Sequence, residues 1–171
     1  MENKNESNTA IRRLNAKGAS GELKDKLMLF GQFVGDWDIV EWRNLKEDGF
    51  WENSIGEVHW GWILGGRATQ DIWMPVGEAV PDMGTTVRFY DPKIDAWRST
   101  WISPTQGVVR EFIGRKVGEE IVLETKDFDG KPMNWIFYDI KKDSFRWRAE
   151  RSSDSGKTWK ITEEMFIVRQ K

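Results

Sequence analysis

The sequence contains no cysteine, which excludes disulfide bonds and thiolate metal sites. It has one histidine, His59, so a zinc site made of several histidines is excluded as well. No run approaches the roughly 18 consecutive apolar residues of a membrane-spanning helix. The polar N-terminus lacks the apolar core of a secretory signal. We therefore expect a cytoplasmic protein that holds no metal.

A strong excess of either charge is also missing, since 26 basic residues face 28 acidic ones and the formal net charge is −2. Nucleic acids and anionic membranes are typically bound by basic surfaces, so we expect neither as a partner. The one basic and aromatic segment is FRWRAER, residues 145–151. We interpret it as a β-strand with Phe145 and Trp147 pointing inward, in preference to a surface on which the bases of single-stranded nucleic acid stack.

Tryptophan, by contrast, is abundant, with 11 in 171 residues, and most lie in short alternating runs. Each tryptophan buries roughly 150–250 Å². So many on closely spaced strands indicate a curved sheet around a wide interior that flat rings fill or half-fill. That composition is typical of a β-barrel that holds a ligand.

The chain divides into a short tail and one domain. Residues 1–20 are polar, asparagine-rich and aperiodic, and we predict a disordered tail there. Residues 21–171 are predicted to form the barrel domain. Apolar residues at helical spacing follow Ser20, a plausible N-cap, and a glycine ends the run, which predicts one helix of about three turns within residues 20–34.

Beyond this helix, turn signals separate ten alternating segments. They are residues 36–45, 50–62, 67–74, 84–90, 96–103, 108–114, 119–127, 133–140, 145–151 and 158–170. Strands that follow one another without helices indicate an antiparallel meander, and closing the sheet removes its exposed edges. We predict an all-β fold, an antiparallel up-and-down β-barrel of about ten strands with one N-terminal capping helix.

The tripeptide Gly35-Asp36-Trp37 is a G-x-W directly after the predicted helix and at the start of the first strand. This arrangement resembles the calycin superfamily, which includes lipocalins, fatty-acid-binding proteins and nitrobindin-like barrels. The resemblance implies that Trp37 plugs the closed end of the barrel. It also implies that an arginine from a late strand packs across this ring, either Arg169 or, as second choice, Arg148.

The chain is also similar to a bacterial calycin-like family of uncharacterised function. The similarity covers residues 22–170 and rests on the turn Leu64-Gly65-Gly66-Arg67, on Tyr90-Asp91 with the downstream Trp97, and on a hairpin near the end. It implies a fold and brings no activity or catalytic residues.

That last hairpin, SSDSGKTW at residues 152–159, fits the Asp-box pattern S-x-D-x-G-x-T-W. We predict a structural turn in which Asp154 accepts backbone N–H bonds and Gly156 takes a positive φ.

Three residues are candidates for acid–base chemistry. If Trp37 points inward, alternation places Glu41 inside the barrel, whereas a β-bulge would turn Trp42 inward and leave Glu41 on the surface. The sequence leaves both arrangements open. His59 is interpreted either as a general base or as a half-buried strand histidine, and Asp71 is the third candidate.

The candidate ligand-binding residues combine aromatic rings with polar anchors. They are Trp60, Trp62, Arg67, Trp73, Arg88, Tyr90 and Trp101. We predict that the barrel binds a small hydrophobic or aromatic molecule. The alternative is a cofactor-independent acid–base enzyme, an isomerase, cyclase or lyase, in the same cavity. A partner-binding module is favoured only if the interior is filled.

Phosphate-binding and nucleotide-binding motifs are missing, so no cofactor is expected. A homodimer is left open.

Overall fold

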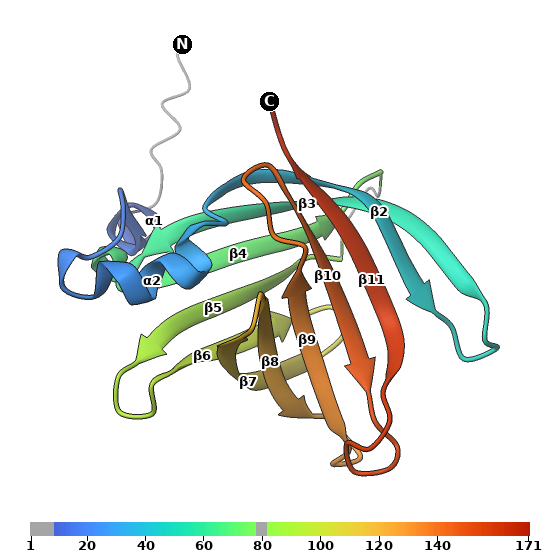
Figure 1. The fold of residues 1–171 in the computed structure, drawn as a ribbon. Coiled ribbons are helices and arrows are strands. Elements are labelled where there is room, and N and C mark those ends of the chain that lie inside the picture. The colour runs from blue at the N-terminus through green and yellow to red at the C-terminus, as the bar shows by residue number, and fades with distance from the viewer. Residues whose placement is uncertain (1–8, 78–81) are drawn as a thin grey trace.

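The computed structural model describes residues 9–77 and 82–171, and its main feature is a closed antiparallel β-barrel (Figure 1). The helical elements are α1 (Thr9–Leu14), η1 (Gly21–Leu23), α2 (Lys24–Gly31) and η2 (Leu64–Gly66). The strands are β1 (Asn15–Ala16), β2 (Gly35–Leu45), β3 (Trp51–Ile63), β4 (Ala68–Pro75), β5 (Gly84–Asp91), β6 (Ala96–Ser103), β7 (Val108–Val117), β8 (Glu120–Lys126), β9 (Pro132–Tyr138), β10 (Ser144–Arg151) and β11 (Lys160–Arg169).

Ten of these strands, β2 to β11, form the barrel wall. The hydrogen-bonded order runs β3-β2-β11-β10-β9-β8-β7-β6-β5-β4, and pairing of β3 with β4 closes the ring. Trp60 lies opposite Asp71 at this closing pair. The predicted fold class, an antiparallel barrel of about ten strands, is therefore confirmed.

The predicted capping helix corresponds to η1 followed by α2, and it covers one end of the barrel (Figure 1). Its inward side chains Leu27 and Phe30 are fully buried. The helix lies so close to β3 that a Cβ added at Gly31 would come within 2.4 Å of the Trp62 ring. Only glycine fits this position, so Gly31 sets how closely the helix can approach the barrel.

The predicted disordered tail differs from the structure in its second half; residues 1–8 lie outside the described residues. From Thr9 the chain forms α1 and then β1, which pairs with the end of β3. The Ser20 amide donates to the carbonyl of Gly66 at 2.9 Å, and a Cβ at Gly66 would come 2.0 Å from the Gly18 carbonyl oxygen. The N-terminal segment thus packs against the turn at residues 64–67. This contact orders the segment, and composition alone does not reveal it.

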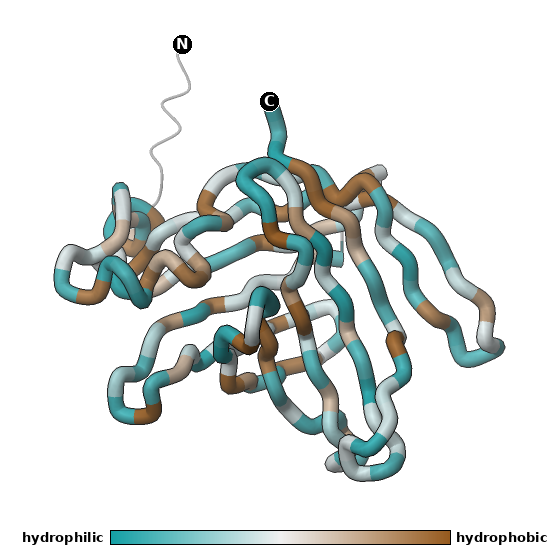
Figure 2. Tube along the Cα trace, in the orientation of Figure 1, coloured by the Kyte–Doolittle hydropathy of each residue, from teal (hydrophilic) through white to brown (hydrophobic). Residues whose placement is uncertain are grey.

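Hydrophilic and hydrophobic residues follow one another closely along the strands (Figure 2), and buried and more accessible positions alternate in β3 and β10. In β10 the inward residues Phe145, Trp147 and Ala149 are buried, while Arg146 and Arg148 are on the outer face. The interpretation of residues 145–151 as an inward aromatic strand is confirmed, because the aromatic rings contribute to the interior.

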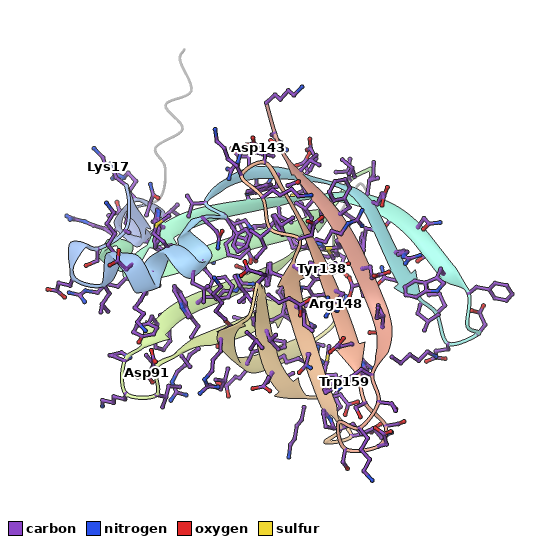
Figure 3. All side chains as sticks on the ribbon, viewed as in Figure 1. Lys17, Asp91, Tyr138, Asp143, Arg148 and Trp159 are labelled. Carbon is purple, nitrogen blue, oxygen red and sulfur yellow. The ribbon has the colours of Figure 1, made fainter. Side chains whose placement is uncertain are left out.

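The hairpin between β10 and β11 lies at the opposite end of the strands from Asp143, as the label on Trp159 shows (Figure 3). Asp154 accepts hydrogen bonds from the amide and the hydroxyl of Thr158, at 2.8 and 2.7 Å. These bonds lower the pKa of Asp154 to about 2. Gly156 has φ +89°, so the Asp-box prediction of a hydrogen-bonded structural turn is confirmed.

Candidate functional site

The end of the barrel beneath α2 is plugged by aromatic rings. Trp37 is 1% exposed, and its indole N–H donates to the carbonyl of Phe33 at 2.6 Å. The guanidinium carbon of Arg169 lies 3.9 Å from the Trp37 ring centroid. Arg169 also donates to the carbonyls of Gln32 and Val34, at 3.3 and 3.2 Å, and so ties the last strand to the segment after α2. This end is therefore closed to a ligand.

Beyond the plug, the interior contains a cavity of about 860 Å³. Six of the eleven tryptophans line it: Trp42, Trp60, Trp73, Trp101, Trp135 and Trp147. Five of them form a chain of edge-to-face contacts around the wall, from Trp42 to Trp73, Trp101, Trp135 and Trp147, with centroid separations of 4.6, 6.2, 5.7 and 5.3 Å. The predicted tryptophan-lined cavity is present.

A glycine makes room for one of these rings. A Cβ at Gly84 of β5 would lie 1.9 Å from the Trp101 ring, so the indole lies directly against the backbone of the neighbouring strand. Any larger residue at Gly84 would push Trp101 into the cavity.

A bulge in β2 decides which residues face the cavity. The pairing register shifts between Ile39 and Trp42 against β3, and the same interruption appears against β11. An extra residue in one strand reverses the facing of all that follow it. Trp42 consequently lines the cavity, while Glu41 is exposed on the outer surface. Of the two arrangements that the sequence left open, the structure has the one that removes Glu41 from the interior.

An ion pair between Asp71 of β4 and Arg88 of β5 is buried in the cavity wall. The second Asp71 oxygen accepts the Thr86 amide at 3.0 Å. The Arg88 guanidinium lies over Trp60, 4.4 Å from the ring centroid, and over Phe30 at 5.2 Å. Burial lowers the pKa of Arg88, and Asp71 opposes that shift. Asp71 is therefore held as a counter-ion, with both of its oxygens engaged.

Several buried donors on the cavity wall have no hydrogen-bond partner within the described part of the chain. They are the indole N–H groups of Trp60, Trp73 and Trp135 and the Nε–H of Arg88. Leaving a buried donor unsatisfied costs about 1–3 kcal/mol. An acceptor atom that reached one of these donors would remove this cost.

A second carboxyl group faces the cavity near its mouth. Glu163 of β11 accepts the indole N–H of Trp42 at 2.7 Å. Burial raises the pKa of Glu163 to about 7, although the Trp42 hydrogen bond and the charge of Arg151 act in the opposite direction. At neutral pH this carboxyl is present in both protonation states, which suits proton transfer or donation to a ligand.

The barrel is similar in structure to known proteins, whereas its sequence matches none of those compared. No protein-family model matches the chain, and no curated protein matches it by sequence. Rv2717c from M. tuberculosis is similar in structure, with a TM-score of 0.60 and 13% identity over 85% of this chain and 98% of that one. The S-type phycobiliprotein lyase CPES from Guillardia theta is similar with a TM-score of 0.56 and 13% identity, over 89% and 99%.

These matches span nearly the whole of both neighbours, and the barrel carries Arg169 stacked on Trp37 at its closed end. This chain has a calycin-like β-barrel. Of the two arginines considered for the stack, Arg169 fills the position. Arg148 lies outside, where it pairs with Glu120 at 3.0 Å and covers the ring of Tyr138 at 4.6 Å (Figure 3).

Ten site residues were predicted in all. Of those predicted to bind a ligand, four line the cavity of this calycin-like barrel: Trp60, Trp73, Arg88 and Trp101. Asp71, predicted as an acid–base group, lines it too. The five others lie elsewhere.

Trp62 and Tyr90 lie at the closed end. Trp62 packs beneath Gly31 of α2, as described above, and Tyr90 donates to Asp95 and contacts Trp97. Both rings contribute to the plug rather than to the cavity wall.

Arg67 and His59 lie outside the barrel. Arg67 is exposed and pairs with Glu22. The ring nitrogens of His59 lie 2.8 Å from Asp36 and 3.2 Å from Glu57 on the outer face, and the hydrogen bond to Asp36 raises the pKa of His59. Neither residue lines the cavity.

Other lining residues are not among the predicted site residues, chiefly Trp135, Trp147, Glu163, Arg110 and Arg151. Period-two alternation could have found most of them. Arg151 continues the inward series of Phe145 and Trp147, and Glu163 lies on the same face of β11 as Arg169.

Among residues 9–77 and 82–171, no cluster of three or more histidine, aspartate or glutamate side chains could hold a metal ion. No helix within those ranges is long and apolar enough to cross a membrane.

Proposed function

We propose that this calycin-like barrel binds a small aromatic or hydrophobic molecule in its interior. The observation that carries the proposal is the cavity of about 860 Å³, lined by six tryptophans and one buried ion pair. Ligand pockets in proteins are mostly apolar, measure about 300–1,000 Å³ and contain a few fixed polar groups. A purely structural barrel would fill this space with side chains.

The wall chemistry narrows the ligand class. Rings stack or meet edge to face on tryptophan, and the unpartnered N–H groups of Trp60, Trp73 and Trp135 favour a ligand with acceptor atoms. A conjugated molecule that carries carbonyl groups meets both requirements.

Titration with 8-anilinonaphthalene-1-sulfonate, a fluorescent aromatic probe, tests the proposal. We expect one probe per chain, quenching of tryptophan emission, and weaker binding when Trp135→Phe removes an unpartnered donor. Trp51→Phe is the matched control, because Trp51 is exposed and stacks with Arg43 away from the cavity. Equal effects of both substitutions, or probe binding without a fixed stoichiometry, would contradict an interior site.

A second candidate function, a cofactor-independent acid–base enzyme, is favoured by Glu163. This carboxyl faces the cavity and has a pKa of about 7, as a general acid or base at neutral pH requires. One structural neighbour is named a lyase, but a shared fold does not carry an activity with it.

Glu163→Gln separates the two functions once a ligand is in hand. A carrier would keep most of its affinity, because glutamine still accepts the Trp42 hydrogen bond. An enzyme would bind its substrate and lose turnover by about 10²–10⁴.

A further inference from the structure

Two arginines face the cavity at the end away from α2. Arg110 belongs to β7 and Arg151 to β10, two strands separated in the wall by β8 and β9. Both side chains line the cavity, Arg110 half-buried and Arg151 exposed. Phe128, in the turn between β8 and β9, covers Arg110 with its ring centroid 5.0 Å from the guanidinium carbon.

Neither guanidinium has a carboxylate within 4 Å among the residues that the structure describes. Burial lowers the pKa of Arg110, and the charge of Arg151 lowers it further. Two like charges that face one space raise the free energy of the empty barrel, and a bound anion would relieve their repulsion.

The carboxylates around the mouth are engaged elsewhere. Glu52 pairs with Lys46 at 2.5 Å, and Asp82 accepts the amide of Gln106 at 2.9 Å. Asp127 accepts the backbone N–H of Lys131 at 2.9 Å. Its charge raises the pKa of Arg110, against the larger lowering by burial and by Arg151. Glu163, on which the charge of Arg151 acts, accepts the Trp42 N–H and is partly protonated at neutral pH.

The deep end of the cavity differs in charge. There Arg88 is neutralised by Asp71, so the remaining Arg88 and tryptophan donors suit uncharged acceptor oxygens rather than a second anion. The cavity therefore has an electrically balanced aromatic floor, and at its mouth two arginines that no carboxylate pairs with directly.

We propose that Arg110 and Arg151 form an anion site at the mouth, so that the ligand is an amphipathic carboxylate with its aromatic body among the tryptophans and its carboxylate at the two arginines. This inference rests on the proposed function and adds to it the charge and the orientation of the ligand. Guanidinium groups suit the task because their planar donors match the geometry of a carboxylate.

A matched pair of probes tests the inference. 1-Pyrenebutyrate and 1-pyrenebutanol share one aromatic body and differ in the carboxylate. We expect wild-type protein to bind the carboxylate about tenfold more tightly or better, since hydrogen bonds to charged groups are the stronger ones. Raising the salt concentration should weaken binding of the carboxylate and leave that of the alcohol unchanged.

Arg110→Gln and Arg151→Gln should each reduce the preference for the carboxylate, and the double variant should abolish it. Arg115→Gln is the control, because Arg115 is exposed on the same strand as Arg110. Circular dichroism checks that each variant is folded. Arg151→Gln alone suffices if Arg110→Gln does not fold, because the Arg151 side chain is exposed.

The outcomes separate the two proposals. Equal affinity of the wild type for both probes, or a carboxylate preference as large in Arg151→Gln as in the wild type, would overturn the anion site and leave cavity binding intact. Failure of the wild type to bind either probe would overturn the proposed function and this inference together.

Discussion

Asp71 and Arg88 lie on adjacent strands and form an ion pair inside the barrel, where their side chains are 5% and 3% exposed. The Arg88 guanidinium also contacts Trp60 and Phe30, rings that belong to the cavity floor and the plug. This pair therefore connects the wall of the cavity to the closed end. Its loss would disturb the packing of both.

Asp71→Asn should destabilise the protein by about 3–5 kcal/mol, because Arg88 would remain buried without a counter-charge. Replacing both residues with apolar ones, Asp71→Leu with Arg88→Met, should recover most of this loss. Urea unfolding measures both effects. A single variant as stable as the wild type would show that the pair is not buried in solution.

Trp37→Ala should lower the free energy of unfolding by about 3–5 kcal/mol, because the change empties a fully buried position at the closed end. The comparison is Trp51→Ala, on the surface, which should cost far less. Equilibrium unfolding followed by circular dichroism distinguishes them. Similar losses for both variants would contradict the role of Trp37 as the plug.

Glu163 should make stability depend on pH. Its pKa rises from an ordinary 4.5 to about 7 in the folded protein, so the folded state binds more protons than the unfolded state between these values. Stability should therefore fall as pH rises from about 4.5 to 7, by roughly 1–3 kcal/mol, and level off above.

Glu163→Gln should remove this component of the pH dependence and be more stable than the wild type at pH 8. Glu111→Gln, at an exposed position on β7, serves as the control. Thermal unfolding at several pH values gives the measurement. A wild type and a Glu163→Gln variant with parallel pH profiles would show that Glu163 is not buried as a carboxylic acid.

Much of the fold could be predicted from the sequence because its signals are local. Ten alternating segments with turn residues between them indicate the strands, and the resemblance of the G-x-W after a helix to calycins implies Trp37 as the plug. The contact of Gly66 with the N-terminal segment joins residues far apart in the chain. No local signal reports it, so the ordering of residues 9–20 could not be predicted.

The candidate site was predicted less completely, for two physical reasons. The bulge between Ile39 and Trp42 reverses the facing of β2, and the sequence alone does not fix where a strand bulges. The second reason is that alternation tells which face of a strand a residue occupies, and not its position along the barrel axis. Tyr90 shares its strand face with Arg88 but lies against the closed end.

The central claim is that a ligand occupies the interior of the barrel, and two adjacent substitutions test it most directly. Val108 of β7 lines the cavity near its mouth, whereas Val109 points outward and is 64% exposed. Tryptophan at Val108 would fill part of the cavity, and tryptophan at Val109 would add the same ring to the surface.

The deciding measurement is the affinity of each folded variant for 8-anilinonaphthalene-1-sulfonate by isothermal titration calorimetry. We predict that Val108→Trp weakens binding at least about tenfold, a loss of about 1.4 kcal/mol or more, while Val109→Trp binds as the wild type does. Equal affinities of the two variants would contradict a ligand site inside the barrel.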